Sequence, residues 1–110
     1  MPLFERARVE VYVPDVPALH YQNLLDTLEQ EFTYTFGGCT VVRGLHGSYL
    51  SQAGFPIADP INVIYTDASI RFEPNVAALS RFTDNLRQAA FEALQEEAVL
   101  VVAFKVHHSV

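Results

Sequence analysis

Two hydrophobic periods alternate along this chain of 110 residues, and their order constrains the fold more than any other feature. Residues 6–13 carry an apolar side chain at every second position, as expected of a strand with one buried face. Residues 21–32 carry apolar side chains at every third or fourth position, as expected of a helix with one buried stripe. The first group is Ala7, Val9, Val11 and Val13, and the second is Tyr21, Leu24, Leu25, Leu28 and Phe32. Strands and helices of this kind must bury their apolar sides against each other.

The rest of the chain repeats this alternation. Segments 39–49 and 61–66 have the composition of strands, and the glycine and prolines of the intervening segment 51–60 predict a loop. A second helix is expected from residue 73 onward. The final segment, 98–106, is apolar from end to end but for one lysine and rich in valine, which is typical of a strand buried on both faces. The stripe expected to be buried on the second helix is Leu79, Phe82, Leu86, Ala90 and Ala93.

The resulting order is strand, helix, strand, strand, helix, strand. Two such halves with right-handed crossovers give a four-stranded antiparallel sheet with both helices on one face, the ferredoxin-like α+β arrangement. We therefore expect a single domain over residues 1–110 with the strand order 4-1-3-2. The first and last strands are the valine-rich ones, and we expect them to form the central pair of the sheet.

Turn residues separate these segments. Asp15 is a candidate cap for the first helix, and Gly37-Gly38 marks the end of that helix. Gly44 and Gly47 interrupt the second strand, which predicts a bulge, a bend or the close approach of another group. Sequence alone leaves open whether these glycines serve structure or function.

An open sheet of this kind leaves one face without helices, and that face is either wet or covered by another subunit. The last strand offers two alternating apolar triplets, so one of them must point away from the helices. An exposed apolar stripe usually marks an interface. We therefore expect a homo-oligomer that forms through the exposed sheet face, with coverage by the N-terminal arm or by segment 51–60 as the alternative. The triplets are Val99, Val101 and Ala103, and Leu100, Val102 and Phe104.

Composition excludes several classes of protein. Seven basic and thirteen acidic side chains give a formal charge of −6, which argues against partners that are nucleic acids or anionic membranes. One cysteine, Cys39, rules out an internal disulfide framework. The apolar run from Ala98 to Phe104 is far shorter than the roughly 20 residues that span a bilayer, and the start lacks an apolar signal core. These features predict a cytoplasmic protein.

The sequence gives no sign of a metal site or a cofactor. Of the four histidines, His107 and His108 are adjacent on a strand and point to opposite faces, so they cannot share one metal ion. We expect both to face solvent. No pair of cysteine and histidine residues has the spacing of a zinc site. Cys39 has no visible neighbour that would lower its pKa, and we expect a small buried residue there.

The central and C-terminal stretches resemble a group of small, uncharacterised bacterial ferredoxin-like domains. The shared pattern is a GG-x-T turn, a glycine followed by an aromatic residue on the second strand, an acidic residue before the third strand, and a Gln-Glu pair before the last strand. It covers residues 35–103, but Tyr49 stands where tryptophan is expected, Asp59 where glutamate is expected, and one residue is added after Gln95-Glu96. The resemblance implies the fold and no particular activity.

The same positions form a hypothetical ligand site. In the expected sheet, the second strand ends near the start of the third, and the segment that contains Glu96 leads into the fourth. Tyr49, Asp59 and Glu96 could therefore line one pocket, with Arg43 or His46 as the opposite charge. A pair of carboxylates can also exchange protons if burial separates their pKa values, so acid–base chemistry stays open. The simpler alternative is a solvated helix end and purely structural glycines.

Two functions follow from these observations. The first is a non-enzymatic oligomeric module that binds a small molecule or a protein, by analogy with PII-like signalling proteins, which combine ferredoxin-like subunits with functional loops. Segment 51–60 would then be the recognition surface. The second uses Pro2: if Met1 is removed, the chain begins with a secondary amine. It then resembles the tautomerase superfamily, in which an amino-terminal proline acts as a general base, although here three residues separate Pro2 from the alternating strand.

Overall fold

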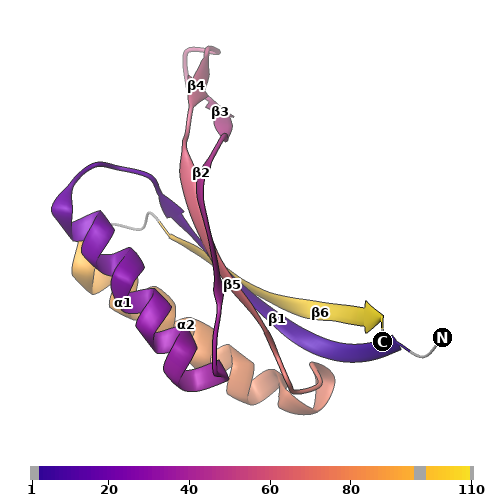
Figure 1. The fold of residues 1–110 in the computed structure, drawn as a ribbon. Helices are drawn as coiled ribbons and strands as arrows, with labels where there is room; N and C mark the ends of the chain where they lie inside the picture. The colour runs from indigo at the N-terminus through magenta and orange to yellow at the C-terminus, as the bar shows by residue number, and fades with distance from the viewer. Residues whose placement is uncertain (1–2, 96–98, 110) are drawn as a thin grey trace.

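The computed structural model describes residues 3–95 and 99–109, without the side chain of Tyr49. It is an α+β fold in which two helices pack on one face of a four-stranded antiparallel sheet, as Figure 1 shows. The elements in chain order are β1 (Leu3–Pro14), α1 (Leu19–Phe36), β2 (Thr40–Leu45), β3 (Ser48–Leu50), β4 (Pro56–Ala58), β5 (Ile61–Ala68), the 3₁₀ turn η1 (Glu73–Asn75), α2 (Val76–Leu94) and β6 (Leu100–Ser109).

The order of strands across the main sheet is β2-β5-β1-β6. Counting only these four strands, this is the 4-1-3-2 order of a ferredoxin-like fold, so the predicted fold class is confirmed. The expectation that the first and last strands form the central pair is wrong. β1 and β5 lie in the centre, and β6 is an edge strand. The valine-rich run of β6 has one apolar face against the helices and a second apolar face that is not covered by them. Its apolar character therefore does not require a central position in the sheet.

The hydrophobic core lies between the helices and the covered face of the sheet. The four alternating residues of β1 are at most 1% exposed, and all five residues of the expected α1 stripe are buried. On α2 the buried residues are Leu79, Leu86, Ala90 and Leu94, so Leu94 takes the place that the periodicity gave to Ala93. Phe32, Phe36 and Phe82 pack edge-on or tilted at the end of this core.

The segment between β2 and β5 is a projecting hairpin rather than a strand followed by a loop. The expected strand 39–49 divides into β2 and β3, and the expected loop 51–60 contains β4, which pairs with β3. We call residues 46–60 the hairpin arm. Its tip is closed by a hydrogen bond from the Ser51 amide to the Phe55 carbonyl and by Gly54 at φ +86°. These short strands are exposed, so no alternation of buried residues marked them in the sequence.

Three glycines have structural roles at turns and contacts. Gly37 ends α1 in the left-handed conformation, at φ +86°. Gly44, at φ +69°, lies where the pairing of β2 with β5 shifts by one residue, which is the predicted bulge. A Cβ on Gly47 would lie 2.7 Å from the carbonyl oxygen of Asp59 in the opposite half of the arm, which is the predicted close approach.

The base of the hairpin arm is attached to the end of β1. Asn62 is 2% exposed, and its side chain accepts a hydrogen bond from the Gly44 amide and donates one to Asp15. The sequence-based prediction that Asp15 caps α1 is therefore wrong. Helix α1 begins after Ala18 without a side-chain cap. The Asp15 amide in turn donates to the Pro60 carbonyl at 2.9 Å.

The molecule is elongated, with principal extents of 48 × 28 × 23 Å and a radius of gyration of 15.3 Å. A compact domain of this length has a radius of gyration of about 13 Å. Figure 1 shows the cause: the hairpin arm projects from one end of the sheet, and the paired ends of β1 and β6 project from the other. Both projections place side chains beyond the body of the molecule.

Candidate functional site

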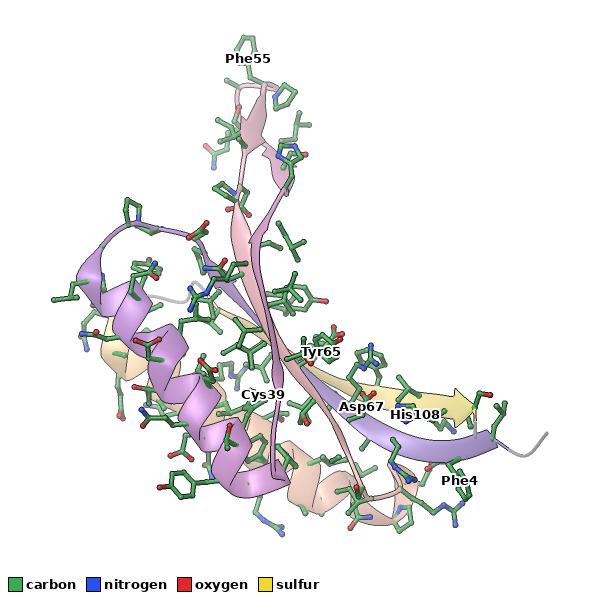
Figure 2. The ribbon with its side chains drawn as sticks, in the orientation of Figure 1. Phe4, Cys39, Phe55, Tyr65, Asp67 and His108 are labelled. Atoms are coloured by element: carbon green, nitrogen blue, oxygen red, sulfur yellow. The ribbon has the colours of Figure 1, made fainter. Side chains whose placement is uncertain are left out.

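The face of the sheet opposite the helices carries a group of interacting polar side chains. We call this face the open face. The strand register places Arg8 of β1 opposite Asp67 of β5, and Glu10 opposite Tyr65. These residues alternate with the buried residues of β1 and β5, so their side chains point away from the helices. Figure 2 shows Tyr65, Asp67 and His108 following one another along the sheet on this side.

Arg8 and Asp67 form the centre of this group. Nε of Arg8 donates to Oδ1 of Asp67 at 2.5 Å, and Nη2 donates to Oδ2 at 2.9 Å, so the pair is bidentate. The guanidinium group lies 4.7 Å from the centre of the Tyr65 ring. The hydrogen bonds to Arg8 hold the pKa of Asp67 below its usual value, and the bond to Asp67 raises the pKa of Arg8. Both groups are therefore ionised at neutral pH.

Two further contacts extend the group in opposite directions. The Tyr12 hydroxyl donates to Glu10 at 2.6 Å, which raises the pKa of Tyr12, and Glu10 lies 3.9 Å from Nη1 of Arg8. On the other side, Nε2 of His108 lies 2.6 Å from Oδ2 of Asp67. We call these six residues the open-face network: Arg8, Glu10, Tyr12, Tyr65, Asp67 and His108.

Apolar side chains of β6 flank the open-face network. The register places Leu100 opposite Tyr12, Val102 opposite Glu10 and Phe104 opposite Arg8, so this triplet is the one that points away from the helices. Leu100 is 58% exposed and Phe104 38%. The other triplet, Val99, Val101 and Ala103, packs against the core. The open face thus combines paired charges with exposed apolar surface.

The two adjacent histidines fall on opposite faces, as their positions in a strand required. His107 lies opposite Glu5 on the side of the helices, and His108 lies on the open face. Both histidines are exposed, as expected, and His108 in addition contacts Asp67. Within residues 3–95 and 99–109, no three His, Cys, Asp or Glu side chains are grouped so that they could hold a metal ion.

The predicted ligand residues lie along the hairpin arm and its base. Arg43 is exposed on β2, His46 is exposed between β2 and β3, and Asp59 is partly buried after β4. The Asp59 amide donates to the Gly47 carbonyl at 2.8 Å, which places Asp59 opposite Gly47 in the hairpin arm. Among the described side chains, no hydrogen bond or ion pair joins Arg43, His46 and Asp59. Glu96, Pro2 and the side chain of Tyr49 lie outside the described part of the chain.

The open-face network was not predicted from the sequence. The alternation of β1 did place Arg8, Glu10 and Tyr12 on the face opposite the core. Asp67 and His108 lie 59 and 100 residues after Arg8 in the chain. Only the pairing register of the strands places them beside Arg8. A charged residue in the middle of a central strand was the available signal, because such a residue needs a partner.

Comparisons with known proteins show the fold. No protein-family model matches the sequence, and no curated protein matches it. Among solved structures, a CPII protein from Thiomonas intermedia K12, determined with ADP, AMP and acetate bound, is similar over all of this chain and 94% of its own, with a TM-score of 0.52 and 14% identity. CutA1 from Oryza sativa is similar over 98% of this chain and 85% of its own, with a TM-score of 0.50 and 15% identity.

None of the helices in the described part of the chain is long and apolar enough to cross a membrane.

Proposed function

We propose that the protein is a non-enzymatic, PII-like binding module that self-associates through its open face and presents the hairpin arm to a ligand or partner. The observation that carries this proposal is the open face itself, where Leu100, Val102 and Phe104 flank the open-face network. Helices cover only the other face of the sheet. Exposed apolar surface beside ordered polar groups is the usual composition of an interface.

A second copy of the chain is the occupant that fits this face. The open face offers acidic, basic, aromatic and aliphatic side chains together, so two copies can meet with complementary groups on both sides. β6 also lies at the edge of the sheet, with one side unpaired by any other described strand. The unpaired N–H and C=O groups of an edge strand form a template for pairing with another chain. The elongated shape adds support, because the ends of β1 and β6 project beyond the helices and leave Leu3 and Phe4 exposed.

The hairpin arm is the proposed recognition element. Leu50 is 71% exposed and Phe55 is 68% exposed, and Figure 2 shows Phe55 at the tip of the arm, far from the helices. Exposed apolar side chains on a projecting element suit contact with a partner. At the base of the arm, Arg43 and His46 would face an anionic group of a small ligand, with Tyr49, Asp59 and Glu96 completing the site.

Self-association is tested by sedimentation velocity over a range of concentrations. Val102→Asp places a charge on the open face, and we expect it to shift an oligomeric wild-type protein to monomers. Val76→Asp is the matched control, since it makes the same change at an exposed position in the first turn of α2, where an acidic residue is tolerated. A wild-type protein that is monomeric up to its solubility limit would overturn the proposed assembly.

Ligand binding is tested by calorimetric titration with ADP and AMP, which the similar CPII protein binds. We expect Asp59→Ala and Tyr49→Ala to weaken any binding, while Thr35→Ala, at an exposed position on α1, leaves it unchanged. Turnover of a titrated ligand would overturn the non-enzymatic part of the proposal. Binding that is unaffected by Asp59→Ala and Tyr49→Ala would remove the ligand site from the base of the arm.

A further inference from the structure

The geometry of the open-face network points to an interface that a proton controls: protonation of His108 tightens association of two copies across the open face. This inference rests on the self-association proposed above and adds its regulation. It starts from a mismatch of charge within the network. Two carboxylates, Glu10 and Asp67, lie within 4 Å of one guanidinium group, that of Arg8. Within the open-face network, Glu10 and Asp67 therefore share a single guanidinium group whenever His108 is neutral.

His108 is placed to supply the missing cation. Its Nε2 lies 2.6 Å from Oδ2 of Asp67, the same oxygen that accepts a hydrogen bond from Nη2 of Arg8. The Asp67 side chain is only 15% exposed, whereas that of His108 is 44% exposed. Solvent can therefore still exchange a proton with the imidazole in the separate subunit, and a covering surface would enclose the contact.

Two further cations lie near this end of the sheet, and among the described residues neither forms an ion pair with Asp67 or Glu10. From β1, Arg6 donates to the Glu5 carbonyl at 3.0 Å, and its guanidinium group lies 5.6 Å from the centre of the Phe4 ring. On β6 itself, Lys105 points to the side of the helices and pairs with Glu73 of η1. Among the described residues of β1, β5 and β6, the titratable or charged groups on the side of His108 are Asp67 and Tyr65 from β5 and Arg6, Arg8, Glu10 and Tyr12 from β1.

Burial under a second copy raises the free-energy cost of leaving a carboxylate charge uncompensated. In water an uncompensated carboxylate is well solvated, but under a second copy it loses that solvation, and an attractive partner charge becomes worth more. The network with a protonated His108 therefore buries at a lower cost than the network with a neutral one. Asp67 stays ionised in this range, because its pKa is held low by Arg8. Association consequently takes up protons, and the dissociation constant falls as the pH falls through the histidine range.

The experiment is sedimentation velocity between about pH 8 and about pH 6, which spans the ordinary histidine range. The variants are His108→Gln, which keeps a donor for Asp67 but cannot become charged, and His107→Gln, which removes the neighbouring histidine on the opposite face. We expect the wild type and His107→Gln to associate at least about fivefold more tightly at the lower pH. We expect His108→Gln to change by less than about twofold and to stay as weak as the wild type at the higher pH.

The matched histidine variant separates this mechanism from a general charge effect. The chain carries a charge of −6, so a lower pH reduces repulsion between copies whatever His108 does. That general effect is the same in both variants, since each loses one histidine. Equal pH dependence in His107→Gln and His108→Gln would overturn the inference and leave the proposed assembly intact. Absence of association by the wild type at every pH would overturn the assembly itself. Thermal unfolding of both variants verifies that they are folded.

Discussion

The two faces of the sheet are made by the same strands and yet differ in almost every physical respect. On β1, Val9 and Val11 are fully buried against the helices, whereas Arg8 and Glu10, which alternate with them, form directed contacts on the open face. The covered face is held by non-directional burial of apolar area. The open face is held by hydrogen bonds and ion pairs, each between specific atoms. We propose that this sheet separates stability, on the covered face, from recognition, on the open face.

The largest expected effect tests whether the covered face carries the stability. Ile64 is fully buried on β5, and Ile64→Ala should lower the free energy of unfolding by about 2–5 kcal/mol, because it removes apolar contacts and leaves a cavity. Urea denaturation at low protein concentration measures this value. Val102→Ala on the open face is the control, with an expected loss of less than about 1 kcal/mol. Equal losses would mean that the two faces share the stability.

The second prediction concerns pH and the open-face network. Asp67→Asn removes the charge that Arg8 binds and should cost about 1–2 kcal/mol at neutral pH. The pKa of Asp67 is lowered in the folded protein, so its contribution is fully present above the unfolded value of about 3.9 and is lost as the pH falls through the lower folded value. The difference between wild type and variant, measured by urea denaturation, should therefore shrink below about pH 4. A constant difference from neutral to acid pH contradicts a charge-dependent pair.

A third prediction moves from the sheet to the hairpin arm. Gly47→Ala places a Cβ against the Asp59 carbonyl, so the two halves of the arm must separate locally. The arm contributes little to the core, and we expect a loss of about 1 kcal/mol or less in the free energy of unfolding, with a larger effect on ligand binding. Amide hydrogen exchange should show loss of protection at Asp59. Gly38→Ala meets no atom within 4 Å and is the control. Full protection of the Asp59 amide in Gly47→Ala would show that the added Cβ does not separate the two halves of the arm.

The smallest expected effect comes from the outer contact of the open-face network. Tyr12→Phe removes the hydroxyl that donates to Glu10 and should cost about 0.5–1 kcal/mol, because both groups can turn to water instead. Its second readout is the phenol titration, since the bond to Glu10 raises the pKa of Tyr12. Absorbance titration of the wild type against Tyr12→Phe isolates that one phenol. A Tyr12 phenol that titrates at its ordinary value would show that the contact with Glu10 does not form in solution.

Several features of the fold could be predicted because they depend on neighbours along the chain. The alternation of β1 and the stripe from Tyr21 to Phe32 reported their buried sides correctly, since each element must present one apolar side to a core. Gly44 and Gly47 predicted a bulge, a bend or a close approach, and the structure shows a bulge at Gly44 and a close approach at Gly47. The Asp15 cap failed because a different donor, the side-chain amide of Asn62, binds the same carboxylate from 47 residues away.

The candidate site was predictable only in part. Arg43, His46 and Asp59 do lie along the hairpin arm and its base, but the short strands β3 and β4 that form the arm left no trace in the hydrophobic pattern. The apolar run of β6 indicated two apolar faces without indicating an edge position. Periodicity describes which sides of an element are apolar, and it does not say which neighbours those sides meet.

By itself, then, the sequence determined the number and type of the main elements, their order, their buried sides and the ferredoxin-like topology that follows from them. These depend on local conformation and on apolar patterning, which the chain carries residue by residue. Only the tertiary structure decided that Arg8, Asp67 and His108 meet, that β6 lies at the edge, and that the arm projects. These depend on pairing register between distant strands, and a shift of one residue in that register would send every one of these side chains to the other face.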